Sequence, residues 1–412
     1  MIAQKRLEEN LTALSKISAE GQGISRLAFS EHEGQACDFI AGKMKEAGLK
    51  VRVDNFGNVI GRRDGLYNDA AVVMMGSHLD SVPNGGNFDG VVGILTALEV
   101  INVMNEQGFQ NEHPIELVVF RAEESSRFGV ATLGSKVMCG HIKADDLRAI
   151  TDKSKRSLYD VLKENGFDAD NIENAVYQDK VKLFLEVHIE QGKVLEATGK
   201  QIGVVTGIAA PTRLRVFLDG HADHSGATPM DMRYDALCAA AEMVLAVENL
   251  GKKTVNPCVA TVGILEVSPC VMNVIPGRVE LGIDIRSIYD NDKSELTQKI
   301  KDAMKEIAQA RGIECEIKEI SDERPVPLRE NVLEFLQKAC LKNGVEHILV
   351  PSGAGHDAMH WAAVYPVGML FIPCREGISH HHHELAKIED IVCSAKILYD
   401  IVAEASCKET KI

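Results

Sequence analysis

Three apolar segments of this chain each end in residues whose side chains can bind a metal ion. They are residues 71–75, followed by His78 and Asp80; residues 114–120, followed by Glu123 and Glu124; and residues 182–187, followed by His188. Each segment has the length and composition of a buried strand in an α/β sheet. In open α/β sheets ligands bind beyond the carboxyl ends of the strands. We therefore expect a fold in which these imidazoles and carboxylates converge on one site.

A glycine-rich loop at residues 84–90 adds another carboxylate, Asp89. The segment after it, Val91 to Met104, carries apolar residues on most helical faces, which predicts a helix covered by a sheet. Upstream, Lys50 to Ile60 has the pattern of a strand. Because strand, loop and helix alternate from residue 70 to 206, we predict an α/β architecture with a largely parallel sheet.

The pattern changes after residue 207, and a chain of 412 residues exceeds the usual size of a single core. The expected elements are, in order, a strand at 213–219, a helix at 235–249, strands at 258–267 and 277–286, a helix at 293–311 and a strand at 314–320. This β-α-β-β-α-β order predicts a small α+β unit. We therefore expect one domain in two parts, 1–207 and 326–412, interrupted by an inserted domain at 208–325.

Charge and hydropathy exclude several classes of protein. The net charge of -15 argues against a nucleic-acid partner, which requires a basic face. No segment has the 18 to 20 apolar residues, roughly, of a membrane span, and the first residues lack the apolar core of a secretory signal. We expect a cytoplasmic location. The ten cysteines are scattered singly, as expected for buried thiols in a reducing compartment.

The polar residues at the strand ends have the composition of a hydrolytic site for two metal ions. Such a site needs several ligands, a bridging carboxylate and a free carboxylate that takes a proton from water. The candidate ligands are His78, Asp89, Glu124 and His188, and Glu123 is the candidate base. Each residue alone is more often a surface or turn residue. Their shared position after buried strands favours a metallohydrolase.

Two local arrangements support this interpretation. Neighbouring side chains diverge at a strand end, so Glu124 can bind metal while Glu123 faces the substrate. Asp80 lies two residues after His78 and, if the strand continues, on the same side of it. We expect the Asp80 carboxylate to fix the imidazole by a hydrogen bond.

Other histidines and an arginine are further candidates. The run His380–His383 is internal and is followed by Glu384, which argues against a purification tag. Four consecutive imidazoles cannot all face one site, so at most one or two are expected to be ligands. In the expected insert, His224 lies in a glycine-punctuated loop, and Asn273 and Arg286 could hold a substrate carboxylate, although an arginine at a strand end is more often a surface charge.

Together these motifs resemble the M20-type dinuclear metallohydrolases, in the branch of amidases, hydantoinases and carbamoylases. The resemblance covers nearly the whole chain and rests on residues 76–82, 85–90, 123–128, 186–192, 224–230, 352–358 and 377–380. It implies an α/β catalytic domain of the metal-dependent exopeptidase type. It also implies that the inserted ferredoxin-like α+β domain is a lid and dimerisation domain, and that the protein is a homodimer.

The resemblance also implies roles for individual residues. Two divalent ions (Zn, Mn, Co or Ni) would be held by His78, Asp89, Glu124, His188 and His380, with Asp89 as the bridge. His380 is selected because the family places this ligand directly after a serine and four residues before a glutamate; the extra His381–His383 depart from that pattern. Glu123 would be the general base. The substrate would be held by Gln191, His224, Asn273, Arg286 and Gly355, with His224 polarising the carbonyl oxygen in the partner's active site.

The implied reaction is hydrolysis of a C–N bond in a small ureido acid. An N-carbamoyl-L-amino acid is the favoured substrate, with ammonia, carbon dioxide and the amino acid as products. The residues named above do not separate this substrate from allantoate, and another M20 amidase or peptidase activity remains an alternative. A non-catalytic metal-binding protein on the same fold is disfavoured, because Glu123 and His224 are present.

Overall fold

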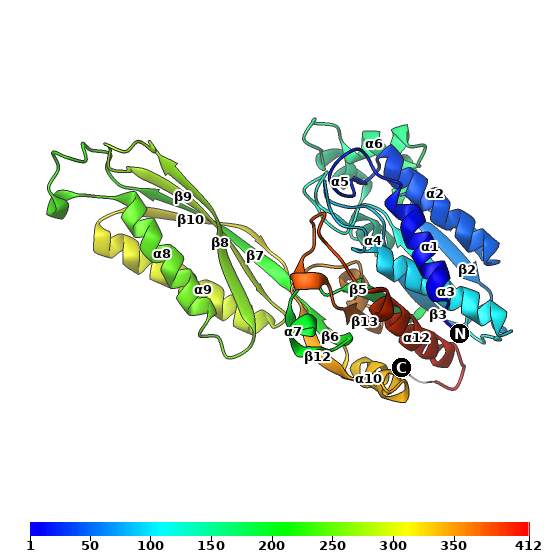
Figure 1. The fold of residues 1–412 in the computed structure, drawn as a ribbon. Helices are drawn as coiled ribbons and strands as arrows, with labels where there is room; N and C mark the ends of the chain where they lie inside the picture. Colours follow the sequence, from blue (N-terminus) through cyan, green and yellow to red (C-terminus); the bar gives the residue numbers. More distant parts are fainter. Residues whose placement is uncertain (411) are drawn as a thin grey trace. The chain divides into compact units, whose positions relative to one another are not determined.

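The computed structural model describes residues 1–410 and 412, and its contacts divide the chain into two compact units (Figure 1). The first unit contains Met1–Thr206, Leu328–Val350 and Gly355–Ile412. The second contains Gly207–Pro327 and Pro351–Ala354. Each unit has its own cluster of buried apolar side chains. Among the described residues, no helix is long and apolar enough to cross a membrane.

The first unit is built on a mixed sheet with the strand order β1-β2-β4-β3-β5-β13-β6, and β12 also pairs with β6. The strands are β1 Lys50–Val53, β2 Val59–Arg63, β3 Val72–His78, β4 Ile115–Phe120, β5 Val181–Ile189, β6 Ile202–Ile208, β12 His347–Ser352 and β13 Val367–Ile372. β4, β3, β5 and β13 run parallel to their neighbours at the centre, whereas β1, β2 and β6 pair antiparallel. The predicted parallel sheet is confirmed for this central part.

The single strand predicted over residues 50–60 is wrong. The chain instead forms β1 and β2, an antiparallel pair joined by a turn. The Asp54 carboxylate stabilises this turn by accepting the backbone N–H groups of Phe56, Gly57 and Asn58 at 2.9 Å each. An aspartate that hydrogen-bonds the backbone two to four residues ahead is typical of turns, and this local bonding outweighs the β propensity of the segment.

Helices cover the sheet of the first unit. They are α1 Gln4–Ser15, α2 Glu31–Glu46, α3 Val91–Glu106, α4 Leu133–Met138, α5 Ala144–Ala149, α6 Leu158–Glu164, α7 Val194–Thr198, α10 Glu330–Lys342, α11 Ala358–Ala362 and α12 Ile388–Ala405, with 3-10 turns η1 Ala169–Ala175 and η3 Arg375–Gly377. The predicted helix after Asp89 is confirmed as α3, in which 13 of 16 residues are buried. It packs against the sheet, α1 and α12, which explains why it is apolar on most faces.

The parallel registers bring the carboxyl ends of the central strands to one edge. His78, the last residue of β3, pairs with Phe120, the last residue of β4. His188 near the end of β5 pairs with Phe371 of β13. The residues that follow β3 and β4 therefore emerge beside each other and close to His188. The topology accounts for the meeting of segments that are far apart in the sequence.

The second unit is a four-stranded antiparallel sheet with the order β10-β7-β9-β8 and two helices. Its elements are β7 Ala210–Asp219, η2 Met230–Met232, α8 Ala236–Gly251, β8 Cys258–Ser268, β9 Arg278–Ser287, α9 Asp290–Arg311, β10 Glu314–Asp322 and the short β11 Val326–Pro327. Alternate residues of β7 are buried in a core shared with α8 and α9. The predicted β-α-β-β-α-β order is confirmed, while its roles as lid and dimerisation domain stay predictions.

Candidate metal centre and active site

The other four predicted ligands gather around the Asp89 carboxylate in the first unit. Oδ1 of Asp89 lies 3.0 Å from Nε2 of His188 and 3.6 Å from Nε2 of His78. Oδ2 lies 3.2 Å from Nε2 of His380. The same His380 nitrogen lies 3.3 Å from Oε1 of Glu124. The two oxygens of one carboxylate therefore face two different groups of donors, which is the arrangement expected of a bridging ligand.

These donors fit a pair of divalent metal ions. They form two sets of three, each with its ligand atoms within 4.8 Å of one another, and Asp89 belongs to both sets. Imidazole nitrogen and carboxylate oxygen suit Zn, Mn, Co or Ni. Burial, followed by repulsion from Asp89, raises the pKa of Glu124 to about 7. Cations would offset this crowding of buried carboxylates, since metal ions replace protons on their ligands.

Backbone carbonyls orient the two buried imidazoles. Nδ1 of His78 lies 3.0 Å from the carbonyl oxygen of Asp80, and Nδ1 of His188 lies 2.9 Å from the carbonyl oxygen of Ile189. A carbonyl only accepts, so the geometry assigns the ring proton to Nδ1 in each neutral imidazole. The lone pair of each Nε2 then points toward Asp89. Both rings are thus held in the tautomer that a metal ligand requires.

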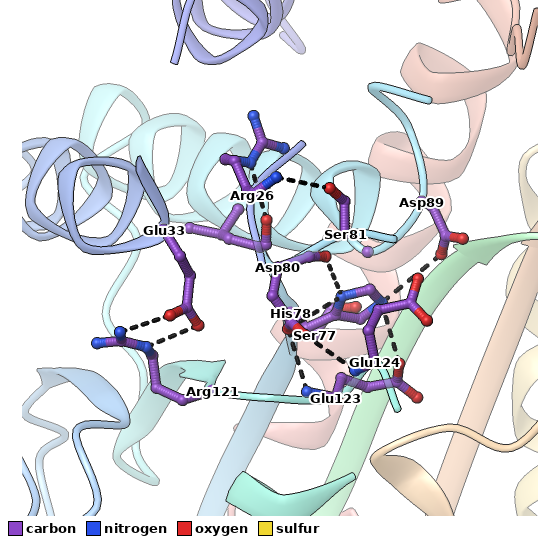
Figure 2. Close-up of polar contacts among 12 residues, drawn as sticks. Arg26, Glu33, Ser77, His78, Asp80, Ser81, Asp89, Arg121, Glu123 and Glu124 are labelled. Carbon is purple, nitrogen blue, oxygen red and sulfur yellow. Dashed lines mark hydrogen bonds and ion pairs between the residues drawn. The ribbon is translucent and has the colours of Figure 1, made fainter. Parts of the chain in front are cut away.

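The structure differs from the sequence prediction in how Asp80 acts. Its carboxylate was expected to bond to the His78 ring, but Oδ1 lies 3.6 Å from Nδ1, beyond hydrogen-bond distance. The two oxygens instead accept the backbone N–H groups of Glu123 at 3.1 Å and Glu124 at 2.9 Å (Figure 2). The reason is that β3 ends at His78, so strand alternation no longer sets the direction of Asp80.

The backbone at Ala122 and Glu123 is also held by the residues that begin α4. Ala122 has a positive φ of 56°, which turns the chain sharply at the end of β4. The carbonyl of Glu123 accepts the N–H of Thr132 at 2.7 Å, and that of Ala122 accepts the N–H of Leu133 at 2.9 Å. Glu123 and Glu124 can therefore diverge. Glu124 reaches His380, while Oε2 of Glu123 lies 3.8 Å from Nε2 of His78.

A buried ion pair lies behind these strand ends, and sequence reasoning missed it. Arg121 donates two hydrogen bonds to Glu33 of α2, at 2.7 Å from Nε and 2.5 Å from Nη2 (Figure 2). Arg26 donates from Nε to the carbonyl of Leu79 at 2.9 Å, which fixes the residue between His78 and Asp80. No local pattern marks these contacts, because Glu33 and Arg121 are 88 residues apart in the sequence.

The loops around Asp89 contribute three further polar groups. Gln191, predicted to bind substrate, donates from Nε2 to Oδ2 of Asp89 at 2.9 Å. The Ser379 hydroxyl lies between the carboxylates of Asp89 and Glu384, at 3.0 and 3.1 Å. Glu384 accepts the backbone N–H groups of Phe88 and Asp89. The sequence pattern of Ser379 and Glu384 served only to select His380 as a ligand. In the structure, both residues also hold the loop that carries Asp89.

The other predicted substrate-binding residues are divided between the two units. Gly355 begins the last segment of the first unit, and a Cβ there would contact only Met359, at 3.7 Å. In the second unit, Nδ1 of His224 accepts the N–H groups of Gly226 and Ala227 at 3.0 and 3.2 Å. This leaves the ring proton of a neutral His224 on the exposed Nε2, where it can be donated.

The remaining two residues also belong to the second unit. The Asn273 carbonyl accepts the N–H of Ser225 at 3.1 Å, which ties its loop to that of His224. Arg286 donates from Nε to Asp284 at 2.7 Å and from Nη1 to the carbonyl of Gly353 at 2.9 Å. The guanidinium is thus oriented by its neighbours. That His224, Asn273 and Arg286 act at the metal cluster stays a prediction.

The contacts of Asp80 lead to a first expected result. In Asp80→Asn, one oxygen becomes an NH2 group that faces a backbone N–H, so the Glu123 backbone shifts. We expect kcat to fall on the order of 10²-fold, the cost of a displacement of about 1 Å at a catalytic group. Metal content should be retained, because the Asp80 carbonyl still orients His78. Steady-state kinetics and metal analysis test this prediction. Asp69→Asn, at an exposed position, is the control. Parallel loss of metal and activity in Asp80→Asn would contradict it.

Known proteins resemble this chain over nearly its whole length. A sequence model of peptidase family M20/M25/M40 matches residues 74–404. The chain is 39% identical to the N-carbamoyl-L-amino-acid amidohydrolase of Pseudomonas sp. (strain NS671), over 97% of this chain and 98% of that protein. It is 35% identical to the allantoate amidohydrolase of Escherichia coli (strain K12), over 96% of each. A solved hydantoinase/carbamoylase family amidase from Burkholderia multivorans matches with a TM-score of 0.93 and 36% identity, over 99% of both chains.

Proposed function

This chain belongs to peptidase family M20/M25/M40, and we propose that it hydrolyses the ureido C–N bond of an N-carbamoyl-L-amino acid, releasing ammonia, carbon dioxide and the amino acid. The protein is an amidohydrolase that acts on C–N bonds other than peptide bonds. The fold type expected from the sequence is confirmed. The main support for hydrolysis is the Asp89 carboxylate, whose two oxygens face two donor sets beside a further carboxylate, Glu123.

The residues of the site supply the steps of such a reaction. When bound, divalent ions would lower the pKa of a water molecule and polarise the substrate carbonyl. A carboxylate oxygen of Glu123 takes a proton from the attacking water and delivers it to the leaving nitrogen. The Asp80 carboxylate and the start of α4 hold the Glu123 backbone during both transfers. Nε2–H of His224 donates to the oxyanion that develops on the carbonyl oxygen.

Recognition of an amino acid derivative requires a partner for its carboxylate. We assign this role to Arg286, assisted by Asn273, because a guanidinium binds a carboxylate through two parallel hydrogen bonds. Asp284 holds Arg286 in one orientation, so little side-chain freedom is lost on binding. Gln191 and Gly355 complete the proposed substrate contacts, and Gln191 would exchange its bond to Asp89 for one to the substrate.

A second expected result concerns this contact. Arg286→Met should raise KM on the order of 10²-fold, because hydrogen bonds to a charged group contribute about 1.5–3 kcal/mol. The fall in kcat should be smaller. Arg278→Met is the matched control, since Arg278 lies on the same strand and its side chain is 62% exposed. Equal KM values for the two variants would exclude Arg286 as the carboxylate partner.

Allantoate is the second candidate substrate. Its support is the 35% identity with the allantoate amidohydrolase of Escherichia coli, and allantoate also carries a carboxylate beside a ureido group. The residues assigned above can bind either molecule.

The proposal also includes the oligomeric state and the location of the protein. We propose a homodimer in which His224 reaches the partner's active site, in the cytoplasm.

Ammonia release distinguishes the two substrates. The protein loaded with Mn or Zn is incubated in parallel with allantoate and with N-carbamoyl-L-amino acids and their D forms. Release from the L-carbamoyl compounds alone is the expected result. Release from allantoate alone would replace the proposed substrate with the second candidate. No release from either, in protein shown to contain metal, would contradict both.

A further inference from the structure

We propose that His381, His382 and His383 form a metal site of their own, separate from the cluster around Asp89, for one late first-row divalent ion such as Ni, Cu or Zn. Each residue offers one ring nitrogen, and these atoms lie within 4.8 Å of one another. The ring centroids of His381 and His382 are 4.1 Å apart, those of His382 and His383 are 4.2 Å apart, and those of His381 and His383 are 4.9 Å apart. The three rings are therefore close enough for side-chain rotation to bring their nitrogens to one ion.

The three imidazoles are not used by the catalytic site. The ring of the preceding residue, His380, faces Asp89 and Glu124. After it the chain enters a turn in which the Glu384 N–H donates to the carbonyl of His381 at 2.9 Å. Over residues 1–410 and 412, no carboxylate lies at ion-pair distance from the rings of His381–His383. The three rings lie beside one another, away from the contacts that His380 makes.

The surrounding chain holds the turn in place. The Glu384 carboxylate accepts the N–H groups of Phe88 and Asp89 at 2.9 and 3.0 Å. Arg375 donates from Nη2 to the carbonyl of His383 at 3.2 Å. Both anchors hold the chain at His383 and Glu384, where the three histidines end. A site whose backbone is already ordered loses less conformational entropy when an ion binds.

Exposure and ligand type define which ions fit. His381 and His383 are exposed, and His382 is half-buried beside Gly23, where an added Cβ would lie 2.8 Å from that of His382. The site has imidazole ligands and no carboxylate, which favours Ni, Cu and Zn over Mg and Ca. Nδ1 of His381 accepts the His383 N–H at 3.2 Å. Coordination by either ring nitrogen releases that bond, because Nδ1 gives its lone pair to the ion or takes the ring proton.

Equilibrium dialysis of the metal-loaded enzyme against Ni²⁺ tests the site, with bound metal counted by mass spectrometry. The wild type should bind one more equivalent of Ni²⁺ than the triple variant H381N/H382N/H383N. His221→Asn, which removes an exposed histidine of the second unit, should bind as the wild type does. Turnover of the triple variant should be unchanged, since His380 remains.

A second variant tests whether the loss of Ni²⁺ binding comes from a disturbed turn. H381N/H383N keeps the half-buried His382 and should also lose the extra equivalent of Ni²⁺. Equal Ni²⁺ binding by the wild type and both multiple variants would overturn the proposal, as would an equal loss in His221→Asn. Because Ni²⁺ is counted directly, this result does not depend on which substrate the enzyme hydrolyses.

Discussion

Replacing Glu123 with Gln is expected to lower kcat on the order of 10³-fold while the protein keeps its bound metal. The amide cannot accept a proton from water or return it to the leaving nitrogen, and general acid–base catalysis contributes roughly 10² to 10⁴ in rate. Metal should remain because Glu123 lies outside both donor sets around Asp89. Stopped or continuous ammonia assays together with metal analysis of the same preparation measure both quantities.

The neighbouring glutamate provides the matched comparison. Glu124→Gln weakens a donor that lies 3.3 Å from His380, so we expect this variant to lose metal as well as activity. Glu306→Gln, at an exposed position of α9, should change neither. Adjacent carboxylates with opposite effects on metal content would support the division into base and ligand. Near-normal turnover in Glu123→Gln would remove Glu123 from the mechanism.

Replacing Arg121 with Met is expected to reduce the free energy of unfolding of the first unit by about 3–5 kcal/mol. Glu33 is fully buried and Arg121 is 3% exposed, so the substitution leaves an unpaired carboxylate in the core. Trp361, the single tryptophan of the chain, lies buried in the same unit and stacks on Phe184. Its fluorescence during urea unfolding therefore reports on the first unit.

A surface ion pair serves as the control for this measurement. Lys252 and Glu248 are 67% and 57% exposed and lie four residues apart at the C-terminal end of α8. Lys252→Met should change stability by less than about 1 kcal/mol. Because Lys252 belongs to the second unit, full unfolding is also followed by circular dichroism. If Arg121→Met unfolds at the same urea concentration as the wild type, the buried pair is not a major source of stability.

Much of the fold and of the candidate site could be predicted from local sequence patterns. Apolar runs that end in His78, Glu124 and His188 are strands whose carboxyl ends meet, because parallel strands share one edge of the sheet. The order of elements in the second unit followed from periodicity alone. The selection of His380 came from the family pattern, and the geometry around Asp89 agrees with it.

What could not be predicted depends on contacts between distant segments. The Asp80 carboxylate was assigned to the wrong donor because the alternation of a strand was continued past its last residue, His78. The pair of Glu33 and Arg121 forms only when the fold brings α2 to the residue that follows β4, and neither residue lies in a recognisable motif. The role of Ser379 likewise becomes visible only once its loop lies against Asp89.

The most direct test of the metal centre is anomalous X-ray diffraction from crystals of the active, metal-loaded protein at the absorption edge of the bound metal. We predict anomalous peaks on both sides of the Asp89 carboxylate, one next to His78 and His188 and one next to Glu124 and His380. Fully active protein whose anomalous maps show no metal beside Asp89 would contradict the assignment of these residues as the ligands.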